Sequence, residues 1–149
     1  MKIITFAIPC YNSQDYMEKC INSLLPGGDD VEIIIVDDGS TDRTSEIANK
    51  YAEQYPGIIR VIHQENGGHG EAVNTGLRNA TGLYYKVVDS DDWVDGEAYA
   101  RVVFTLKELV KENHPIDMLL TNYVYEKVSE NHQRRMIYSP LFPENQIIG

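Results

Sequence analysis

The sequence has 149 residues, with 13 Lys and Arg against 23 Asp and Glu, for a formal net charge of −10. This length suits one domain with a sizeable core, and the acidic balance excludes the basic footprint that nucleic-acid binding requires. The two cysteines fit neither a disulfide framework nor a zinc site, and no apolar run approaches the roughly 20 residues of a membrane span. We therefore expect a cytoplasmic protein, with attachment to the inner face of a membrane left open.

Short apolar runs alternate with amphipathic stretches along most of the chain. The runs are nearly continuous, as in strands buried on both faces, and Pro9 is expected to end the first of them. Strands that alternate with helices at this spacing predict right-handed βαβ units and a parallel sheet. The expected strands are residues 3–8, 32–36, 58–63 and 83–88, and the expected helices are residues 15–25, 43–55, a segment containing 72–80, and 96–113.

Beyond residue 113, residues 116–128 and 134–138 predict two more strands around a polar turn. The predicted fold class is therefore α/β, Rossmann-like, with three α/β/α layers around a mostly parallel sheet and a C-terminal strand pair. We expect a single domain over residues 1–149, with βα units in 1–95 and a helix plus strands in 96–149.

The fourth apolar run ends in three carboxylates, Asp89, Asp91 and Asp92, followed by Trp93. Carboxylates this close stay ionised together only if a cation or other donors neutralise them. Mg²⁺ or Mn²⁺ would suit this stretch because hard cations prefer oxygen ligands. The alternative is a solvated acidic turn in which Asp91 or Asp92 caps the next helix. The stretch by itself leaves both interpretations open.

Two further loops, residues 9–13 and 37–42, should leave the same edge of the sheet, where open α/β sheets bind ligands. Tyr11 could stack on a planar base or be a partly buried core aromatic. A strand-end carboxylate in the second loop could accept the N–H of a pyrimidine ring. The alternative for this loop is helix capping, and Asp42 is the expected cap.

The glycine-rich loop at residues 66–70 could approach phosphates or ribose closely through bare backbone. It is not a dinucleotide fingerprint, because Val73 stands where the third glycine or alanine belongs, and the sequence contains no P-loop. His69 in this loop could hydrogen-bond a ligand or be simply solvated.

Together these motifs resemble the family 2 glycosyltransferases in order and spacing, over about residues 3–95. The segments that carry the resemblance are Ile8-Pro9-Cys10-Tyr11-Asn12, Val36-Asp37-Asp38-Gly39-Ser40-Thr41-Asp42, Asn66-Gly67-Gly68-His69-Gly70 with Asn74-Thr75-Gly76-Leu77, and Asp89-Ser90-Asp91-Asp92. The resemblance implies a GT-A fold, a nucleotide-sugar donor with uridine preferred, a divalent metal (Mn²⁺ or Mg²⁺) and inversion at the anomeric carbon.

The resemblance also implies roles for individual residues. Tyr11 and Asp38 would hold the base, and Asp89-Ser90-Asp91 would be the DxD motif. Asp91 would bind the metal on the diphosphate, with Asp89 as a second ligand that also contacts ribose or donor sugar, and Asp92 would lie in a supporting position. The implied donor-binding residues are Pro9, Tyr11, Asp38, Gly68, His69, Asp89 and Ser90.

The sequence does not identify a general base for the acceptor, which is expected to be a glycan or lipid. Glu97, Asp117 and Glu126 are the carboxylates to consider if transfer is found. We expect a piece of a longer transferase that binds donor with little transfer and self-associates if an apolar patch is exposed. Two alternatives are a donor-binding module without turnover and a receiver-like Mg²⁺-binding domain. The second should carry its acid pair after the first strand, whereas here the pair follows the second.

Overall fold

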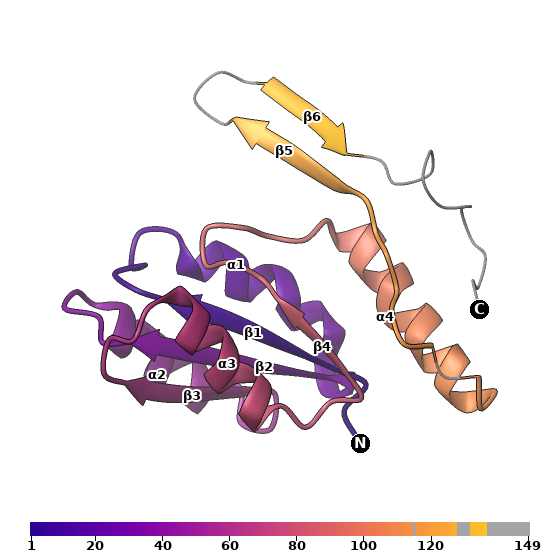
Figure 1. Ribbon diagram of the computed structural model, residues 1–149, viewed down its shortest axis with the longest axis horizontal. Coiled ribbons are helices and arrows are strands. Elements are labelled where there is room, and N and C mark those ends of the chain that lie inside the picture. The colour runs from indigo at the N-terminus through magenta and orange to yellow at the C-terminus, as the bar shows by residue number, and fades with distance from the viewer. Residues whose placement is uncertain (115, 128–131, 137–149) are drawn as a thin grey trace. The chain divides into compact units, whose positions relative to one another are not determined.

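The computed structural model describes residues 1–114, 116–127 and 132–136 (Figure 1). The chain divides into two compact units, Met1–Glu108 and a second one that begins at Leu109. The elements in chain order are β1 (Ile4–Cys10), α1 (Met17–Leu24), the 3-10 helix η1 (Leu25–Asp30), β2 (Val31–Asp38), α2 (Thr44–Gln54), β3 (Ile59–Gln64), α3 (His69–Asn79), β4 (Tyr84–Val87), α4 (Gly96–Lys111), β5 (Tyr123–Lys127) and β6 (His132–Met136). The expected single donor-binding domain over residues 1–149 stays a prediction.

The first unit is built on a parallel sheet with strand order β3-β2-β1-β4. This is the 3-2-1-4 order of the Rossmann half, and it differs from the 2-1-3-4-5 order of receiver-like folds. The predicted parallel sheet is thus confirmed, and the receiver-like alternative does not fit. The sheet is buried on both faces in β1 and β2, which explains their continuous apolar runs.

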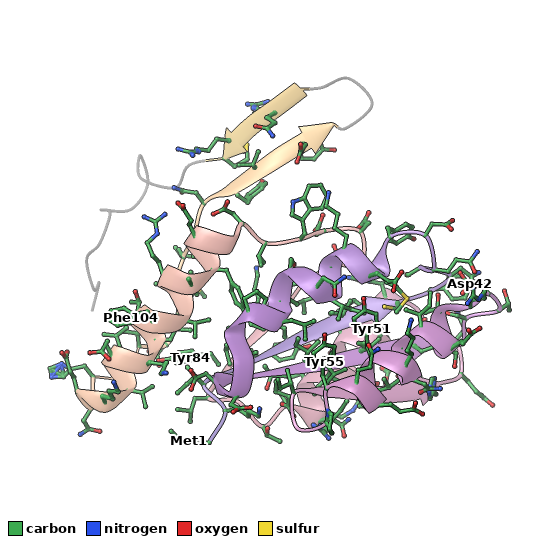
Figure 2. All side chains as sticks on the ribbon, turned by 180° about the vertical axis from the view of Figure 1, so that it is seen from behind. Met1, Asp42, Tyr51, Tyr55, Tyr84 and Phe104 are labelled. Carbon is green, nitrogen blue, oxygen red and sulfur yellow. The ribbon has the colours of Figure 1, made fainter. Side chains whose placement is uncertain are left out.

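Helices cover the two faces of this sheet (Figures 1 and 2). On one face α3 approaches closely, because a Cβ at Gly76 would lie only 2.6 Å from the Ala7 Cβ. On the other face Phe6 meets Tyr99 of α4 edge-on, with ring centroids 5.6 Å apart. The Tyr99 hydroxyl donates to the Leu24 carbonyl of α1 at 2.9 Å, so these helices are joined across the core. The three predicted layers are present.

The end of the first strand differs from the expectation. Pro9 does not end β1, since it pairs with Val36 inside the strand. Ala7 O accepts the N–H of Val88, so alternate residues of β1 direct their polar backbone atoms toward β4. Pro9 lies beyond the end of β4, so no residue of that strand stands opposite it. Its missing N–H therefore costs the sheet no hydrogen bond. The donor contact expected of Pro9 stays a prediction.

The start of the first helix was also predicted wrongly. The helix begins at Met17 rather than at about residue 15, and its N-cap residue, Tyr16, makes no side-chain cap bond. Ser13 contributes through its backbone instead, because its carbonyl accepts the N–H groups of Tyr16 (3.2 Å) and Met17 (3.0 Å). The Ser13 side chain contacts Ser90 instead, with the two Oγ atoms 2.8 Å apart.

The described part of the second unit contains the predicted strand pair, β5 and β6, in antiparallel register. The first strand is shorter than residues 116–128, because only Tyr123–Lys127 have paired partners on β6. The expected turn at 129–133 is wrong at its end, because His132 and Gln133 belong to β6, while residues 129–131 and the end of the second expected strand at 137–138 lie outside the described residues. None of the described helices combines the length and apolar character that crossing a bilayer requires.

Candidate functional site

Four loops follow the carboxyl ends of β1 to β4, and we name them loop 1 (residues 11–16), loop 2 (39–43), loop 3 (65–68) and loop 4 (88–95). The strand order reverses between β1 and β4, and open α/β sheets bind ligands at this switch point. Ser13 Oγ of loop 1 and Ser90 Oγ of loop 4 lie 2.8 Å apart there. Ser90 is therefore a buried link between the loops, and its contact with a donor stays a prediction.

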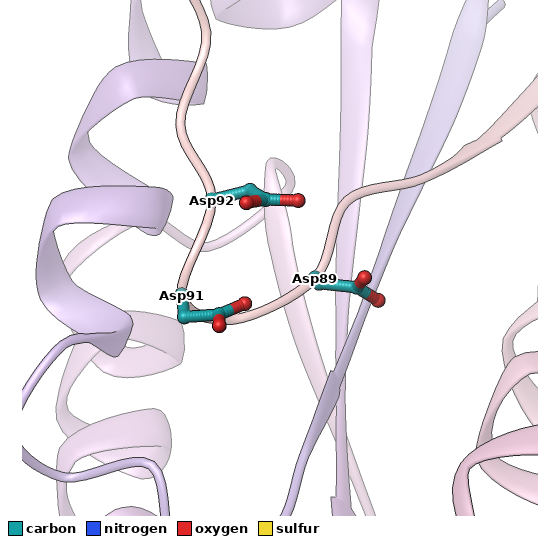
Figure 3. Close-up of side chains that lie close together, drawn as sticks. All are labelled: Asp89, Asp91 and Asp92. Atoms are coloured by element: carbon teal, nitrogen blue, oxygen red, sulfur yellow. The ribbon is translucent and has the colours of Figure 1, made fainter. Parts of the chain in front are cut away.

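Loop 4 presents the three acids as one exposed cluster (Figure 3). Asp89, Asp91 and Asp92 each offer an oxygen, and these oxygens lie within 4.8 Å of one another. The turn closes through the Asp92 N–H, which donates to the Asp89 carbonyl at 2.9 Å. Asp92 thus stands beside the other two as a third carboxylate. The capping alternative is wrong, because Asp95 Oδ1 accepts the Ala98 N–H at the start of α4.

The electrostatics of this cluster suit a hard cation. Burial raises the pKa of the Asp92 carboxyl, and the charges of Asp91 and Asp89 raise it further, with Lys86 opposing them. Three like charges at this spacing repel one another, and a bound cation would relieve the repulsion. A set of oxygen ligands alone fits Mg²⁺ or Mn²⁺ better than zinc or copper.

Helix α1 holds loop 4 in place. The Lys19 Nζ lies 3.4 Å from the centroid of the Trp93 ring, a cation–π contact. One residue further on, the Val94 N–H donates to Ser23 Oγ at 3.2 Å. The acidic cluster is therefore anchored on a helix at its C-terminal side and on loop 1 at Ser90.

Asp38 is the end of β2, not part of the following turn, and it holds loop 3. Its Oδ1 accepts the Gly67 N–H (2.8 Å) and Gln64 Nε2 (2.7 Å), and its Oδ2 accepts the Gly68 N–H (2.9 Å). Burial alone would raise the pKa of this carboxyl, but these donors outweigh burial and lower it. Gly68 has φ +91, which favours glycine, so loop 3 can turn its N–H groups toward Asp38.

His69 connects loop 3 with the acidic cluster. It is the first residue of α3 rather than a loop residue, and its Nε2 lies 3.6 Å from Asp89 Oδ1. Both side chains are more than half exposed, at 64% and 51%. The structure thus brings the predicted His69 and Asp89 together on an open surface at the start of a helix, where anions are favoured.

Loop 1 and loop 2 hold each other through Asn12. Its N–H donates to Ser40 Oγ at 3.0 Å, and its Oδ1 accepts the Thr41 N–H at 2.8 Å. Asn12 has φ +49, a left-handed conformation that asparagine tolerates better than most residues. The neighbouring Tyr11 is 52% exposed, so it is not the core aromatic that was the alternative interpretation. Its ring is free to meet a ligand.

Asp37 points to the opposite side of β2 from Asp38 and makes a hydrogen bond with His63 that the sequence did not suggest. Its Oδ2 lies 2.9 Å from His63 Nδ1, and its Oδ1 accepts the Ser40 N–H at 3.1 Å. His63 Nε2 lies 2.9 Å from Asn49 Oδ1 on α2. The only signal was the period of two in a strand, which places neighbouring acids on opposite faces.

Asp42, which is labelled in Figure 2, caps α2 as predicted, although it does so from the position before the N-cap residue Arg43, which makes no side-chain cap bond. Asp42 Oδ1 accepts the Thr44 N–H at 2.9 Å at the start of α2, and Oδ2 accepts the Gln14 N–H of loop 1 at 3.2 Å. These donors outweigh the effect of burial and lower the pKa of the Asp42 carboxyl. Asp42 therefore stabilises the helix and also ties loop 2 to loop 1.

The four loops form a closed ring of contacts. Loop 1 contacts loop 2 through Asn12, and loop 2 approaches loop 3 at Gly39, where a Cβ would lie 2.8 Å from the Asn66 N. Loop 3 leads into His69, which lies beside Asp89 of loop 4, and loop 4 returns to loop 1 through Ser90. The loops of this ring carry an exposed aromatic ring, bare backbone and a carboxylate cluster, which is a set suited to a base, phosphates and a cation.

An open hollow of about 350 Å³ lies beside α1 and α2 and is lined in part by loops 1 and 2. Its lining residues are Gln14, Asp15, Glu18, Arg43, Glu46, Ile47 and Lys50. Arg43 is already bound by Glu46 at 2.9 Å, and the lining acids outnumber the bases. The hollow therefore suits an anionic ligand less well than the ring of loops does.

Known proteins with similar sequences are glycosyltransferases. The family model described as glycosyl transferase family 2 matches residues 5–146. The chain is 37% identical over 147 residues to the uncharacterized glycosyltransferase EpsJ of Bacillus subtilis, covering 98% of this chain and 40% of that protein. It thus spans well under half the length of the relatives it matches.

Solved structures agree with this similarity. The TarS residues 1–349 of S. aureus in complex with UDP-GlcNAc match with a TM-score of 0.63 and 33% identity, over 72% of this chain and 32% of that one. The mannosyltransferase PcManGT of Pyrobaculum calidifontis, in complex with GDP-Man and Mn²⁺, matches with a TM-score of 0.61 and 28% identity, over 71% and 32%. The sheet is that of a GT-A glycosyltransferase. The chain belongs to glycosyl transferase family 2.

Proposed function

We propose that this chain binds the donor of an inverting, metal-dependent glycosyltransferase that uses a UDP-sugar. The closed ring of four loops carries the proposal, because it places a carboxylate cluster, glycine backbone and an exposed tyrosine at one sheet edge. The neighbouring structures with UDP-GlcNAc and with GDP-Man and Mn²⁺ support a nucleotide-sugar donor and a divalent ion. The uridine base and the inversion rest on the family resemblance.

In this proposal each part of the ring has its own task. Tyr11 stacks on the base, and Asp38 accepts a ring N–H. Backbone of loop 3 and His69 lie along the ribose and phosphates, while Asp89, Asp91 and Asp92 hold Mn²⁺ or Mg²⁺. When bound, that ion supplies Lewis-acid stabilisation of the charge on the leaving diphosphate.

The acceptor side is a separate proposal. A glycan or lipid hydroxyl would attack from the face opposite the leaving group, with a carboxylate taking its proton. Glu97 is exposed in the first turn of α4, whereas Asp117 and Glu126 belong to the second unit, which is not placed relative to the ring. We assign none of them as the base, and we keep inner-membrane attachment and self-association as proposals.

The test is a calorimetric titration of the 149-residue chain with UDP-GlcNAc, UDP and ADP in MnCl₂, followed by a transfer assay with mixed acceptors. We expect saturable binding of both uridine nucleotides, weaker binding of ADP, and little acceptor-dependent release of UDP. Absence of nucleotide binding at millimolar ligand would refute the donor site. Robust acceptor-dependent release would show that a base lies within this chain, and Glu97, Asp117 and Glu126 would be substituted in turn.

A further inference from the structure

Gln64 lies between Asp38 and helix α3, and its amide orientation is determined by its neighbours. Its Nε2 donates to Asp38 Oδ1 at 2.7 Å, and its Oε1 accepts the Thr75 hydroxyl at 2.6 Å. The Thr75 Oγ1 in turn accepts from Arg78 Nη2 at 3.2 Å. Because an ionised carboxylate can only accept, the amide nitrogen faces Asp38, and the amide oxygen is left to accept the Thr75 hydroxyl.

The contacts of Gln64 and loop 3 determine how many acceptor positions remain on Asp38. An ionised carboxylate has about four lone-pair sites, two on each oxygen. Oδ1 is used twice, by Gln64 and Gly67, while Oδ2 is used once, by Gly68. One acceptor position remains, and it is on Oδ2. Asp38 is only 3% exposed, so the carboxylate cannot turn to offer a second oxygen without breaking these bonds.

We propose that Gln64 and Thr75 form a specificity-determining relay that restricts Asp38 to a single acceptor, so that this site selects uridine over guanosine nucleotides. Uracil presents one ring N–H between two carbonyls, which one acceptor satisfies. Guanine presents a ring N–H next to an amino group, and a carboxylate pairs with both only if both oxygens are free. The inference rests on the proposed function, in which Asp38 meets the base.

A substitution at Thr75 tests the inference more sharply, because it changes the partner of Gln64 and leaves the side chains of Asp38 and Gln64 themselves unaltered. Thr75 is buried in α3 at 8% exposure, and its hydroxyl holds the amide in place by donating to the Gln64 Oε1. Thr75→Val removes the hydroxyl with nearly the same shape, and Thr75→Ser keeps it. A relay predicts that valine loses selectivity and serine restores it, whereas a packing role predicts that valine, the better shape match, is the milder change.

The experiment measures the dissociation constants of UDP and GDP in MnCl₂ for the parent chain and the variants Gln64→Met, Thr75→Val and Thr75→Ser. Gln54→Met, at an exposed position in α2, is the matched control. We expect the parent to prefer UDP, and Gln64→Met, which frees an acceptor position on Asp38 Oδ1, to strengthen GDP binding about tenfold, as for one added hydrogen bond, with a smaller effect on UDP. Thr75→Val should act in the same direction about threefold, and Thr75→Ser and Gln54→Met should behave as the parent.

Three results would overturn the inference. Equal weakening of UDP and GDP by Gln64→Met and Thr75→Val would show that the relay only maintains the fold, and so would an unchanged ratio. A parent chain that prefers GDP would refute the selectivity while leaving the proposed donor site intact. A parent that binds neither nucleotide would refute the proposed function, and this inference with it. If Gln64→Met does not fold, the comparison of Thr75→Val with Thr75→Ser decides.

Discussion

The two ends of the parallel sheet each hold a buried carboxylate on β2, but they satisfy it differently. Glu32, near the amino end, is 5% exposed, and Asp38, at the carboxyl end, is 3% exposed. Glu32 is bound by the Arg60 guanidinium at 2.8 and 3.1 Å, by the Thr5 hydroxyl at 2.6 Å and by the Thr81 N–H at 2.8 Å. The three groups bound to Asp38 are all neutral donors.

This difference separates a structural carboxylate from a functional one. At the amino end a cation and two further donors outweigh burial and lower the pKa of Glu32, which leaves the site complete in itself. At the carboxyl end the charge of Asp38 is stabilised but not neutralised, and three more carboxylates stand in loop 4. A bound cation could neutralise the carboxylates of loop 4, and the N–H of a nucleotide base could donate to Asp38.

The largest stability effect should come from the amino end. Removing one partner of a buried ion pair costs about 3–5 kcal/mol, and the half-exposed Arg60 side chain places Arg60→Met near the lower limit, about 3 kcal/mol. Urea unfolding measures it, and Arg43→Met is the control, because its pair with Glu46 is exposed and its loss should change the free energy of unfolding little. Equal losses of unfolding free energy in the two variants would show that the buried Glu32 network contributes no more to stability than the exposed Arg43–Glu46 pair.

Asp38→Ala should weaken UDP binding by about 2 kcal/mol, the usual range for a hydrogen bond to a charged group. Calorimetry with UDP and with ADP distinguishes the causes, because a base contact predicts a much smaller loss for the purine nucleotide. The same loss for both would mean that Asp38 acts by holding Gly67 and Gly68, which would make it a structural residue like Glu32.

Asn12→Ala should have the smallest effect, about 1 kcal/mol of stability together with weaker UDP binding, because alanine disfavours φ +49 and cannot accept the Thr41 N–H. Asn113→Ala is the matched control, since Asn113 has φ +56 at the end of α4. We expect it to lose similar stability with no change in UDP affinity. A loss of UDP affinity in the control would show that this effect comes from stability alone.

The sequence predicted the strands and the clustering of acids at one edge, because both follow from apolar periodicity and from the direction of parallel strands. It could not predict which groups satisfy each acid. The pairing of Asp37 with His63 and of Asp38 with Gln64 depends on the register between β2 and β3, which one sequence does not state. Asp92 joins the cluster only because the turn brings its N–H onto the Asp89 carbonyl.

Pro9 and Asn12 illustrate the same limit in the backbone. Proline usually ends a strand, yet here its missing N–H falls where β4 has already ended. Asparagine in a loop is common, and only the structure shows that it adopts a positive φ and binds loop 2 through both its N–H and its amide oxygen. A residue type indicates which backbone conformations and hydrogen bonds a position tolerates, and only the structure shows which of them are adopted.

The central claim is that the carboxyl edge of the sheet binds a nucleoside diphosphate through a divalent ion. Thermal unfolding of the parent chain, Asp91→Asn and Asp29→Asn, with UDP and either MnCl₂ or EDTA, tests it most directly, because a ligand of the native state raises the midpoint. Asp29 is an exposed acid that directly precedes Asp30, the last residue of η1 before β2, so it serves as the control. We predict that UDP raises the midpoint only with Mn²⁺, in the parent and Asp29→Asn but not in Asp91→Asn. Equal stabilisation of Asp91→Asn, or stabilisation that persists in EDTA, would contradict the account.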